Sequence, residues 1–301
     1  MRVLTPLAAT LALAFALPAA TAADLPPRPT VGDIVKASKP GDWRPLDPQN
    51  TLYMELPSGR VVIELAPDFV PGTAANIRAL ARENYFDGLA IIRSQDNYVV
   101  QWGDPDEEHP RALKKAAAKV KAEFTVPMAQ DKHFVAMPDK DGYAPQVGHS
   151  HGFPSARDPK SGRTWLAHCY GMVGVARDND PDSGNGSQLY VVTGNAPRHL
   201  DRNITVAGRV VSGMALLSTL PRGTGPLGFY EKPEQRLQIK SVRLAADVPE
   251  AERSKLEVMR TETDTYAKVV DAARNRGGPW TVYSPGYVEL CNAPIPVREQ
   301  K

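Results

Sequence analysis

The stretch FDGLAIIRSQDNYVVQWGD, residues 86–104, contains two short apolar runs, LAIIR and YVVQW, separated by a polar turn and ended by Gly103-Asp104. Both runs are rich in β-branched and aromatic residues, and turn residues bound them, which is typical of β-strands. The stretch therefore predicts two consecutive short strands.

Similar signals continue on both sides of this stretch. LYMEL (52–56) and VVIEL (61–65) alternate in polarity and are joined by the turn Pro57-Ser58-Gly59-Arg60, which predicts a β-hairpin. An amphipathic helix is predicted from Thr73, and a short helix is predicted over 214–220. About eight strands with two flanking helices, and no strand–helix alternation, favour a mainly β fold built as a closed antiparallel barrel. The other strand candidates are 133–138, 172–176, 188–194, 205–211 and 235–244.

Three further segments are assigned by composition. RALKKAAAKVKAEF (111–124) predicts a short helix with a solvated lysine face. Residues 139–164 have no period and predict a long loop, which is usually functional, stapled or mobile. Residues 247–301 predict a helical extension with a proline-broken tail that covers the barrel or docks a partner. The resulting organisation is a barrel domain at 51–246 with an insertion at about 105–170.

Composition narrows the function classes. The chain has 301 residues, a hydrophobic fraction of 42% and a formal net charge of +2. Such a charge gives no basic field of the kind that nucleic-acid binding requires. The 28 prolines and 23 glycines indicate many turns rather than a helical bundle.

The N-terminus has the pattern of a secretory signal peptide. Arg2 precedes an apolar run at 3–17 and a small-residue cleavage site, so residues 1–22 are expected to be removed and the protein to be periplasmic or secreted. A membrane anchor fits less well, because the run is short and contains Pro6. Residues 23–50 are proline-rich and are expected to lie on the surface or to be disordered.

Cys169 and Cys291 are the two cysteines of the chain. An exported chain meets an oxidising compartment, where the pair either forms a disulfide that closes a long loop or remains as two buried thiols. No oligomeric state is predicted.

The sequence does not match several familiar motifs of catalytic, nucleotide-binding and metal-binding sites. GNGSQ (184–188) is not Gly-x-Ser-x-Gly, and no glycine-rich nucleotide loop follows a strand. The acidic run at 178–182 lacks the glycine and glutamate of a calcium loop, so a solvated turn is the better interpretation. His149, His151, His168 and Cys169 do not have the spacing of a structural zinc site. Neither a metal nor a cofactor is therefore expected.

Three motifs occur in one order along the chain. Arg93 stands eight residues before Gln101, which precedes Gly103-Asp104; then Gly186-Ser187-Gln188 enters an apolar strand; then Leu200-Asp201 is followed by Gly208-Arg209-Val210 and Gly213-Met214. In this order the segments 86–104, 171–194 and 199–220 resemble the cyclophilin family of peptidyl-prolyl isomerases. The resemblance covers roughly Leu52 to Leu244, interrupted by the inserted residues.

The resemblance implies a site. Arg93 takes the position of the catalytic arginine and Gln101 that of its partner. Arg177, His199 and Ile204 depart from the asparagine, tryptophan and histidine common in the family. The positions that would line the proline pocket or hold the peptide are Tyr98, Val99, Ala176, Arg177, Gln188, Tyr190, His199 and Leu200.

These residue types suit rotation about an X–Pro bond. The barrier of about 18–20 kcal/mol comes from amide resonance, so an enzyme needs only to hold the peptide and favour the twisted amide. The guanidinium of Arg93 stays charged and can donate to that amide. We therefore expect a prolyl isomerase that acts on proline-containing segments of exported proteins. The alternatives are a cyclophilin-like module that binds peptides without turnover, an ordinary surface role for Arg93, and a strand-capping role for Gln188. Besides the isomerase and the peptide-binding module, a third possible class of protein is a metal-handling protein built around His149, His151 and His168.

Overall fold

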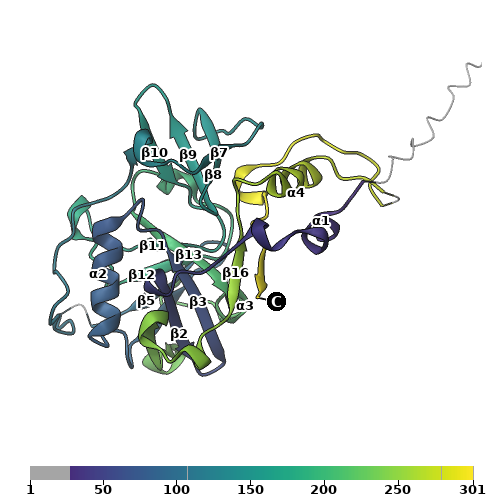
Figure 1. Cartoon of the computed structure of the whole chain (residues 1–301). Helices are drawn as coiled ribbons and strands as arrows, with labels where there is room; N and C mark the ends of the chain where they lie inside the picture. Colours follow the sequence, from purple (N-terminus) through teal and green to yellow (C-terminus); the bar gives the residue numbers. More distant parts are fainter. Residues whose placement is uncertain (1–27, 107, 279, 301) are drawn as a thin grey trace, which may run out of the picture.

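The computed structural model describes residues 28–300 except 107 and 279. The expected signal peptide at 1–22 lies outside the described residues. The main body is a nine-stranded sheet in which every pairing is antiparallel, in the order β14-β4-β5-β12-β11-β13-β3-β2-β15 (Figure 1). Its strands are β2 (Thr51–Leu56), β3 (Gly59–Leu65), β4 (Ala90–Ser94), β5 (Val99–Gly103), β11 (Met172–Val175), β12 (Leu189–Val192), β13 (Val206–Ser212), β14 (Leu237–Gln238) and β15 (Ser241–Leu244).

The mainly β, antiparallel prediction is confirmed, whereas the prediction of a closed barrel is wrong. The end strands β14 and β15 do not pair with each other, so the sheet is a curled half-barrel. The chain itself passes between the two edges: Ile239 N donates to Leu89 O beside β4, and Lys240 N donates to Glu55 O of β2. Ile239 and Lys240, which connect β14 to β15, therefore occupy the place where these two strands would have to pair to close the barrel.

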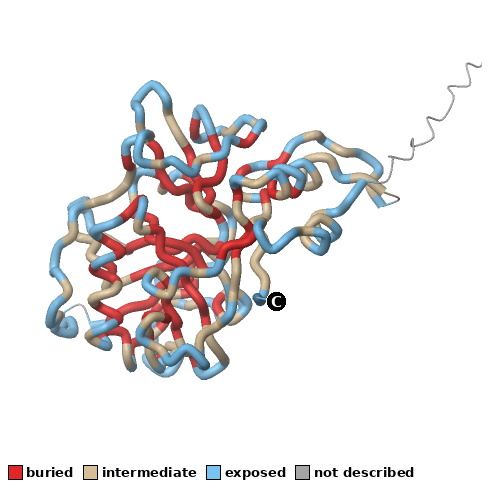
Figure 2. The backbone as a smooth tube through the Cα atoms, in the orientation of Figure 1, coloured by how far each residue is buried: buried red, intermediate tan, exposed pale blue. Residues whose placement is uncertain are grey.

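Two helices flank the sheet as predicted. α2 (Pro71–Arg82) begins with a proline at its first position, where the missing N–H costs nothing, so the helix starts two residues before Thr73. It buries Ile77 and Leu80 against the core of the sheet. α3 (Met214–Ser218) is a single short helix after β13. Figure 2 shows the buried residues concentrated between α2 and the strands.

The helix predicted at 111–124 is absent from the structure. Side chains around α2 take up the backbone N–H groups that a helix would have bonded internally. Glu83 Oε2 accepts from the N–H groups of residues 114–116, at 2.7–3.2 Å, and Asn76 Oδ1 accepts from Ala117 N at 2.7 Å. Tertiary contacts therefore outweigh the helix propensity of the alanines and lysines.

The prediction of a long loop over 139–164 is also wrong, because half of that segment is strand. β6 (Val126–Pro127), β7 (Phe134–Ala136), β8 (Gln146–Ser150), β9 (Phe153–Asp158) and β10 (Arg163–Leu166) form a second antiparallel sheet in the order β6-β10-β9-β8-β7. Phe153 and Trp165 are buried within it. Short strands with a proline and glycines at their turns carry a weak sequence signal.

The leader and the C-terminal extension form a third unit together. β1 (Trp43–Pro45) pairs with β16 (Leu256–Met259), which pairs with β17 (Val297–Glu299). α1 (Val31–Ala37) packs beside α4 (Asp264–Arg274), as Figure 1 shows. The described part of the leader thus contains regular structure and is mostly exposed or half-buried, which fits the first of the two expected outcomes, and the extension contains strands as well as one helix.

Covalent and ionic contacts join the three units. Cys169 and Cys291 form a disulfide across 122 residues of sequence. Buried Glu64 of β3 is paired with Arg44 at 2.6 Å and with Arg209 at 3.2 Å.

Within the described residues, no helix has the length and apolar character needed to cross a membrane. Short 3₁₀ turns lie at Pro40–Asp42, Pro48–Asn50, Met128–Gln130, Pro181–Ser183, Arg198–Leu200, Pro226–Gly228, Pro233–Gln235, Ala245–Asp247, Glu250–Glu252 and Leu290–Asn292.

Candidate active site

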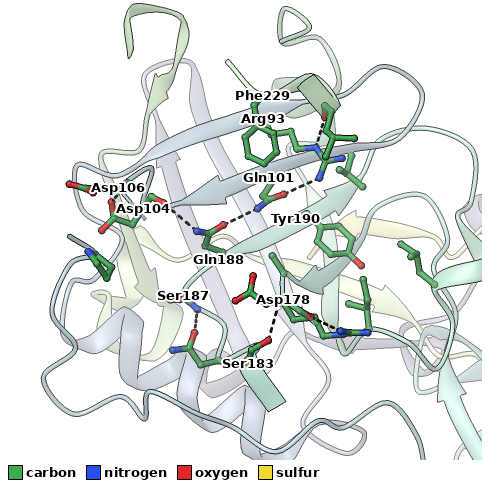
Figure 3. A pocket seen from close by; sticks show the side chains of 18 of the residues that line it. Arg93, Gln101, Asp104, Asp106, Asp178, Ser183, Ser187, Gln188, Tyr190 and Phe229 are labelled. Atoms are coloured by element: carbon green, nitrogen blue, oxygen red, sulfur yellow. Dashed lines mark hydrogen bonds between the residues drawn. The ribbon is translucent and has the colours of Figure 1, made fainter. Parts of the chain in front are cut away.

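A cavity of about 750 Å³ opens on the face formed by β4, β5 and β12 (Figure 3). Loops at 104–110, 176–187 and 227–229 complete its rim. The residues that line it are Tyr85, Arg93, Tyr98, Val99, Gln101, Asp104, Asp106, Pro110, Ala176, Arg177, Asp178, Ser183, Asn185, Ser187, Gln188, Tyr190, Leu200, Ile204, Leu227 and Phe229. It therefore brings together every residue that the sequence assigned to the site except His199.

Arg93 on β4 is held from several sides. Its Nε donates to Leu227 O at 2.7 Å, and its Nη1 donates to Gln101 Oε1 at 3.3 Å. Nη2 donates to Gln95 Oε1. Burial lowers the pKa of Arg93, while the neighbouring Tyr98 and Tyr190 act to raise it. A guanidinium titrates so far above physiological pH that this side chain stays charged in the cavity.

A chain of amides fixes the direction of the Gln101 side chain. Gln101 Nε2 donates to Gln188 Oε1 at 2.9 Å, and Gln188 Nε2 donates to Asp104 O at 3.3 Å. With its nitrogen committed to Gln188, Gln101 presents its oxygen to Arg93, as the dashed lines in Figure 3 show. The orientation of the arginine thus depends on Gln101 of β5 and on Gln188, the residue just before β12.

Glycines make room for this chain of amides. A Cβ at residue 103 would lie 2.6 Å from Gln188 Cγ. Gly186, with a φ of 87°, approaches α2 so closely that a Cβ there would lie 2.6 Å from Ile77 Cγ1. Both positions therefore require glycine, which accounts for the pattern Gly186-Ser187-Gln188 at the start of β12.

One wall of the cavity is apolar. Val99, Tyr190 and Val192 form a small buried cluster, against which Tyr98 and Ile204 pack. The Arg93 guanidinium lies 5.5 Å from the Tyr98 ring centroid and 5.3 Å from that of Phe229. A proline ring seated on this wall would have its amide beside a fixed cation.

The far side of the cavity is polar. Ala176 and Arg177 follow β11, and Arg177 Nε donates to Asn203 O at 2.9 Å. His199 was expected in the rim, but it is exposed and is absent from the lining. In the 3₁₀ turn Arg198–Leu200, buried Arg198 and cavity-lining Leu200 occupy the inward positions, which leaves the side chain between them in solvent.

The histidines considered as metal ligands are engaged elsewhere. His149 Nε2 meets Tyr266 Oη at 3.1 Å, and His168 meets Asp201 and Tyr190. Throughout the part of the chain that the structure describes, no cluster of three or more metal-ligating side chains occurs. These histidines consequently do not converge on one site.

Residues 51–244 match the model of the family described as "Cyclophilin type peptidyl-prolyl cis-trans isomerase/CLD", and this match spans more than half of the chain. The chain belongs to the cyclophilin family. Two curated relatives show how far the likeness extends. A probable peptidyl-prolyl cis-trans isomerase of Brucella suis is 31% identical over 178 residues, covering 59% of this chain and 74% of the relative. A peptidyl-prolyl cis-trans isomerase-like 3 of Gallus gallus is 27% identical over 200 residues, covering 65% and 96%.

A solved structure extends the likeness beyond the cyclophilin domain. The cyclophilin AquaCyp293 from Hirschia baltica superimposes with a TM-score of 0.69 at 25% identity, covering 90% of this chain and 98% of the other. That coverage exceeds the part matched by the family model. Most of the leader, insertion and extension of this cyclophilin therefore has a counterpart in AquaCyp293.

Two cavity residues beside Arg93, Leu227 and Phe229, were not predicted from the sequence. Leu227 and Phe229 flank Gly228, whose φ of 78° and close approach to Gln95 Cα, at 2.6 Å from a Cβ added there, fix a tight turn. The run Gly225-Pro226-Leu227-Gly228-Phe229 could have indicated them. Large apolar side chains in a glycine-proline turn are too far from a core to be buried there, and exposed apolar groups often mark a binding site. No motif relates this turn to Arg93, 134 residues away.

Proposed function

We propose that this cyclophilin catalyses cis–trans isomerisation of X–Pro bonds in exported proteins, with Arg93 as the catalytic group. The observation that carries the proposal is the placement of Arg93: a charged guanidinium, oriented by Gln101 and by Leu227 O, borders the apolar wall of the cavity. A proline ring on that wall would leave its nitrogen within reach of the guanidinium.

The reaction needs no covalent step. As the amide twists, resonance is lost and the proline nitrogen gains a lone pair that accepts a hydrogen bond. Arg93 donates to that developing acceptor and therefore binds the twisted state more tightly than either planar isomer. Tyr98, Val99 and Tyr190 hold the ring, while Ala176, Arg177 and Gln188 contact the flanking peptide.

Refolding of a protein whose slow phase is a prolyl isomerisation tests this proposal. Uncatalysed, such a phase takes tens to hundreds of seconds. The mature chain at substoichiometric concentration should shorten the phase, with a rate that rises linearly with its concentration. An unchanged slow phase would contradict catalysis.

The alternative function is peptide binding without turnover, and Ile204 favours it. This side chain lies in the cavity wall and offers no hydrogen bond to a peptide. A pure binder would hold the unfolded chain and leave the slow phase unchanged or slower. The refolding experiment thus separates the two functions.

Export is the second part of the proposal and rests on residues 1–22. Expressed from its own start codon in a Gram-negative host, the protein should appear in the periplasmic fraction with Ala23 as its first residue. Recovery of the uncleaved chain in the cytoplasm would overturn the assignment.

A further inference from the structure

Tyr190 is seated in a space made for it. It lies on β12 directly opposite Gly174 of β11. A Cβ at residue 174 would overlap Cζ and the hydroxyl of Tyr190. The absence of a side chain at 174 thus leaves room for the whole phenol ring of this wall residue, including its polar end.

The hydroxyl of Tyr190 meets a buried histidine. His168 Nε2 lies 3.0 Å from Tyr190 Oη, and the two rings lie in nearly parallel planes, 13° apart, with their centroids separated by 6.4 Å. His168 is 1% exposed and Tyr190 is 5% exposed. Burial raises the pKa of Tyr190 well above its usual range, so this phenol keeps its proton.

Asp201 determines which nitrogen of His168 carries the proton. Asp201 Oδ1 lies 3.0 Å from His168 Nδ1 and accepts from His168 N at 2.9 Å, and Oδ2 accepts from Arg198 Nε at 2.6 Å. Burial acts to raise the pKa of Asp201, but the hydrogen bonds from His168 and the charge of Arg198 outweigh it and lower the pKa. An ionised carboxylate only accepts hydrogen bonds, so Nδ1 carries a proton, and in the neutral imidazole Nε2 is then the acceptor.

The same chain of contacts reaches the insertion. Arg198 donates from Nη1 and Nη2 to both carboxylate oxygens of Asp141, at 2.9 and 3.1 Å. The two side chains are 5% and 9% exposed. A paired, bidentate anchor from the loop before β8 therefore fixes Arg198, and through it Asp201 and His168.

We propose that His168 is a positioning residue for the proline-binding wall: held in one tautomer by Asp201, it accepts the hydrogen bond of the Tyr190 hydroxyl and keeps that hydroxyl away from the cavity. The inference rests on the proposed function insofar as the wall holds proline. Without His168 the hydroxyl would have no partner on its buried side, and it would turn to the water in the cavity at the point where the ring of a substrate must pack.

A double-mutant cycle tests the inference. His168→Leu should weaken binding of an Ala-Pro-containing tetrapeptide, measured by NMR titration, and raise KM, each by about tenfold, because a buried hydroxyl loses its partner. The value of kcat should change less than about threefold, because Arg93 is untouched. In a Tyr190→Phe background the same His168→Leu change should have almost no effect, since no hydroxyl remains to be satisfied.

His168→Gln supplies the matched control, because its side-chain oxygen can replace Nε2 as the acceptor; it should retain peptide affinity within about threefold of wild type. Equal losses from His168→Leu in the wild-type and Tyr190→Phe backgrounds would show a merely structural role and overturn the inference. Peptide titration does not depend on turnover, so a wild type that binds peptide without isomerising it would refute the proposed function and leave this inference standing.

The tautomer of His168 in the folded wild type provides a test that requires no variant. Long-range ¹H–¹⁵N correlation spectra should show a protonated Nδ1 and an unprotonated, hydrogen-bonded Nε2. A protonated Nε2 would mean that His168 donates to Tyr190, which would overturn the inference even if every His168 variant fails to fold.

Discussion

Gln188 Oε1 accepts a hydrogen bond of 2.9 Å from Gln101 Nε2, and this contact settles the orientation of both amides. Because the Gln101 nitrogen is used in this way, its oxygen is left for the Arg93 guanidinium. The glutamine that precedes β12 is therefore part of the support of Arg93 and not only a groove residue. This position of the Gln188 side chain requires glycine at residue 103, because a Cβ there would collide with Gln188 Cγ.

Replacing Gln188 should consequently impair the site without removing any group from Arg93 itself. Gln188→Ala frees Gln101 to rotate and should lower kcat/KM by about five- to twentyfold, equivalent to about 1–2 kcal/mol for one lost polar contact. The rate is measured with an X–Pro peptide. Gln146→Ala, which alters an exposed glutamine of β8 outside the cavity lining, is the control; an equal loss there would show that Gln188 has no special link to Arg93.

The turn at 226–229 should be as important as the strands. Gly228→Ala places a methyl group against Gln95 Cα and forces an alanine to a φ of 78°, so the turn must shift and release Arg93 from Leu227 O. We expect kcat/KM to fall about ten- to hundredfold, since small displacements of catalytic groups are costly. Gly142→Ala, which meets nothing within 4 Å, is the control. Unchanged activity of a folded Gly228→Ala protein would contradict the role given to the turn.

The disulfide should stabilise the whole assembly. Cys169–Cys291 closes a loop with a sequence separation of 122, and in the chain-entropy model its loss costs about 4–5 kcal/mol. The double variant Cys169→Ser, Cys291→Ser should show a lower midpoint of urea unfolding, and a reductant should lower the midpoint of the wild type only. Equal midpoints for the disulfide-bonded wild type and the double variant would show that the three units are held by non-covalent contacts alone.

His149 should make stability depend on pH. Burial, together with the charge of Arg209, lowers the pKa of His149 to about 3. The unfolded histidine titrates near pH 6.5, so between about pH 6.5 and 3 the unfolded state binds more protons, and stability falls as the pH falls. At pH 4.5 the loss should be about 2–3 kcal/mol relative to pH 7.

The measurement is urea unfolding of wild type and His149→Gln at both pH values. The variant should lose less stability on acidification, because the group responsible is gone. His109→Gln, which alters an exposed side chain, is the control and should follow the wild type. Parallel curves for wild type and His149→Gln would contradict the assignment.

Part of this molecule follows from local sequence rules. The hairpin of β2 and β3 was predicted from alternation and its turn, and Arg93, Gln101 and Gln188 were placed together because their spacing matches that of a family. Spacing carries such information when the residues lie on neighbouring strands of one sheet, whose register fixes their distance.

The remaining features depend on contacts that local rules do not contain. Residues 111–124 have the composition of a helix, yet Glu83 and Asn76 accept hydrogen bonds from their backbone N–H groups, and the segment is irregular. The prediction of a closed barrel was wrong because the chain between β14 and β15 donates hydrogen bonds to both edges of the sheet, and the two end strands therefore do not pair with each other. The pairing of His168 with Tyr190 joins residues with no shared motif, and only their burial together shows it.

Exchange NMR on a short X–Pro peptide measures directly whether Arg93 accelerates rotation about the X–Pro bond. Wild-type protein should produce cis–trans exchange that is absent without enzyme, and Arg93→Ala should reduce its rate by several hundredfold, or about 3–4 kcal/mol. Arg82→Ala, a surface arginine paired with Asp247, is the matched control and should exchange at the wild-type rate. Exchange that is undiminished in a folded Arg93→Ala protein, or absent with wild type, would contradict the account.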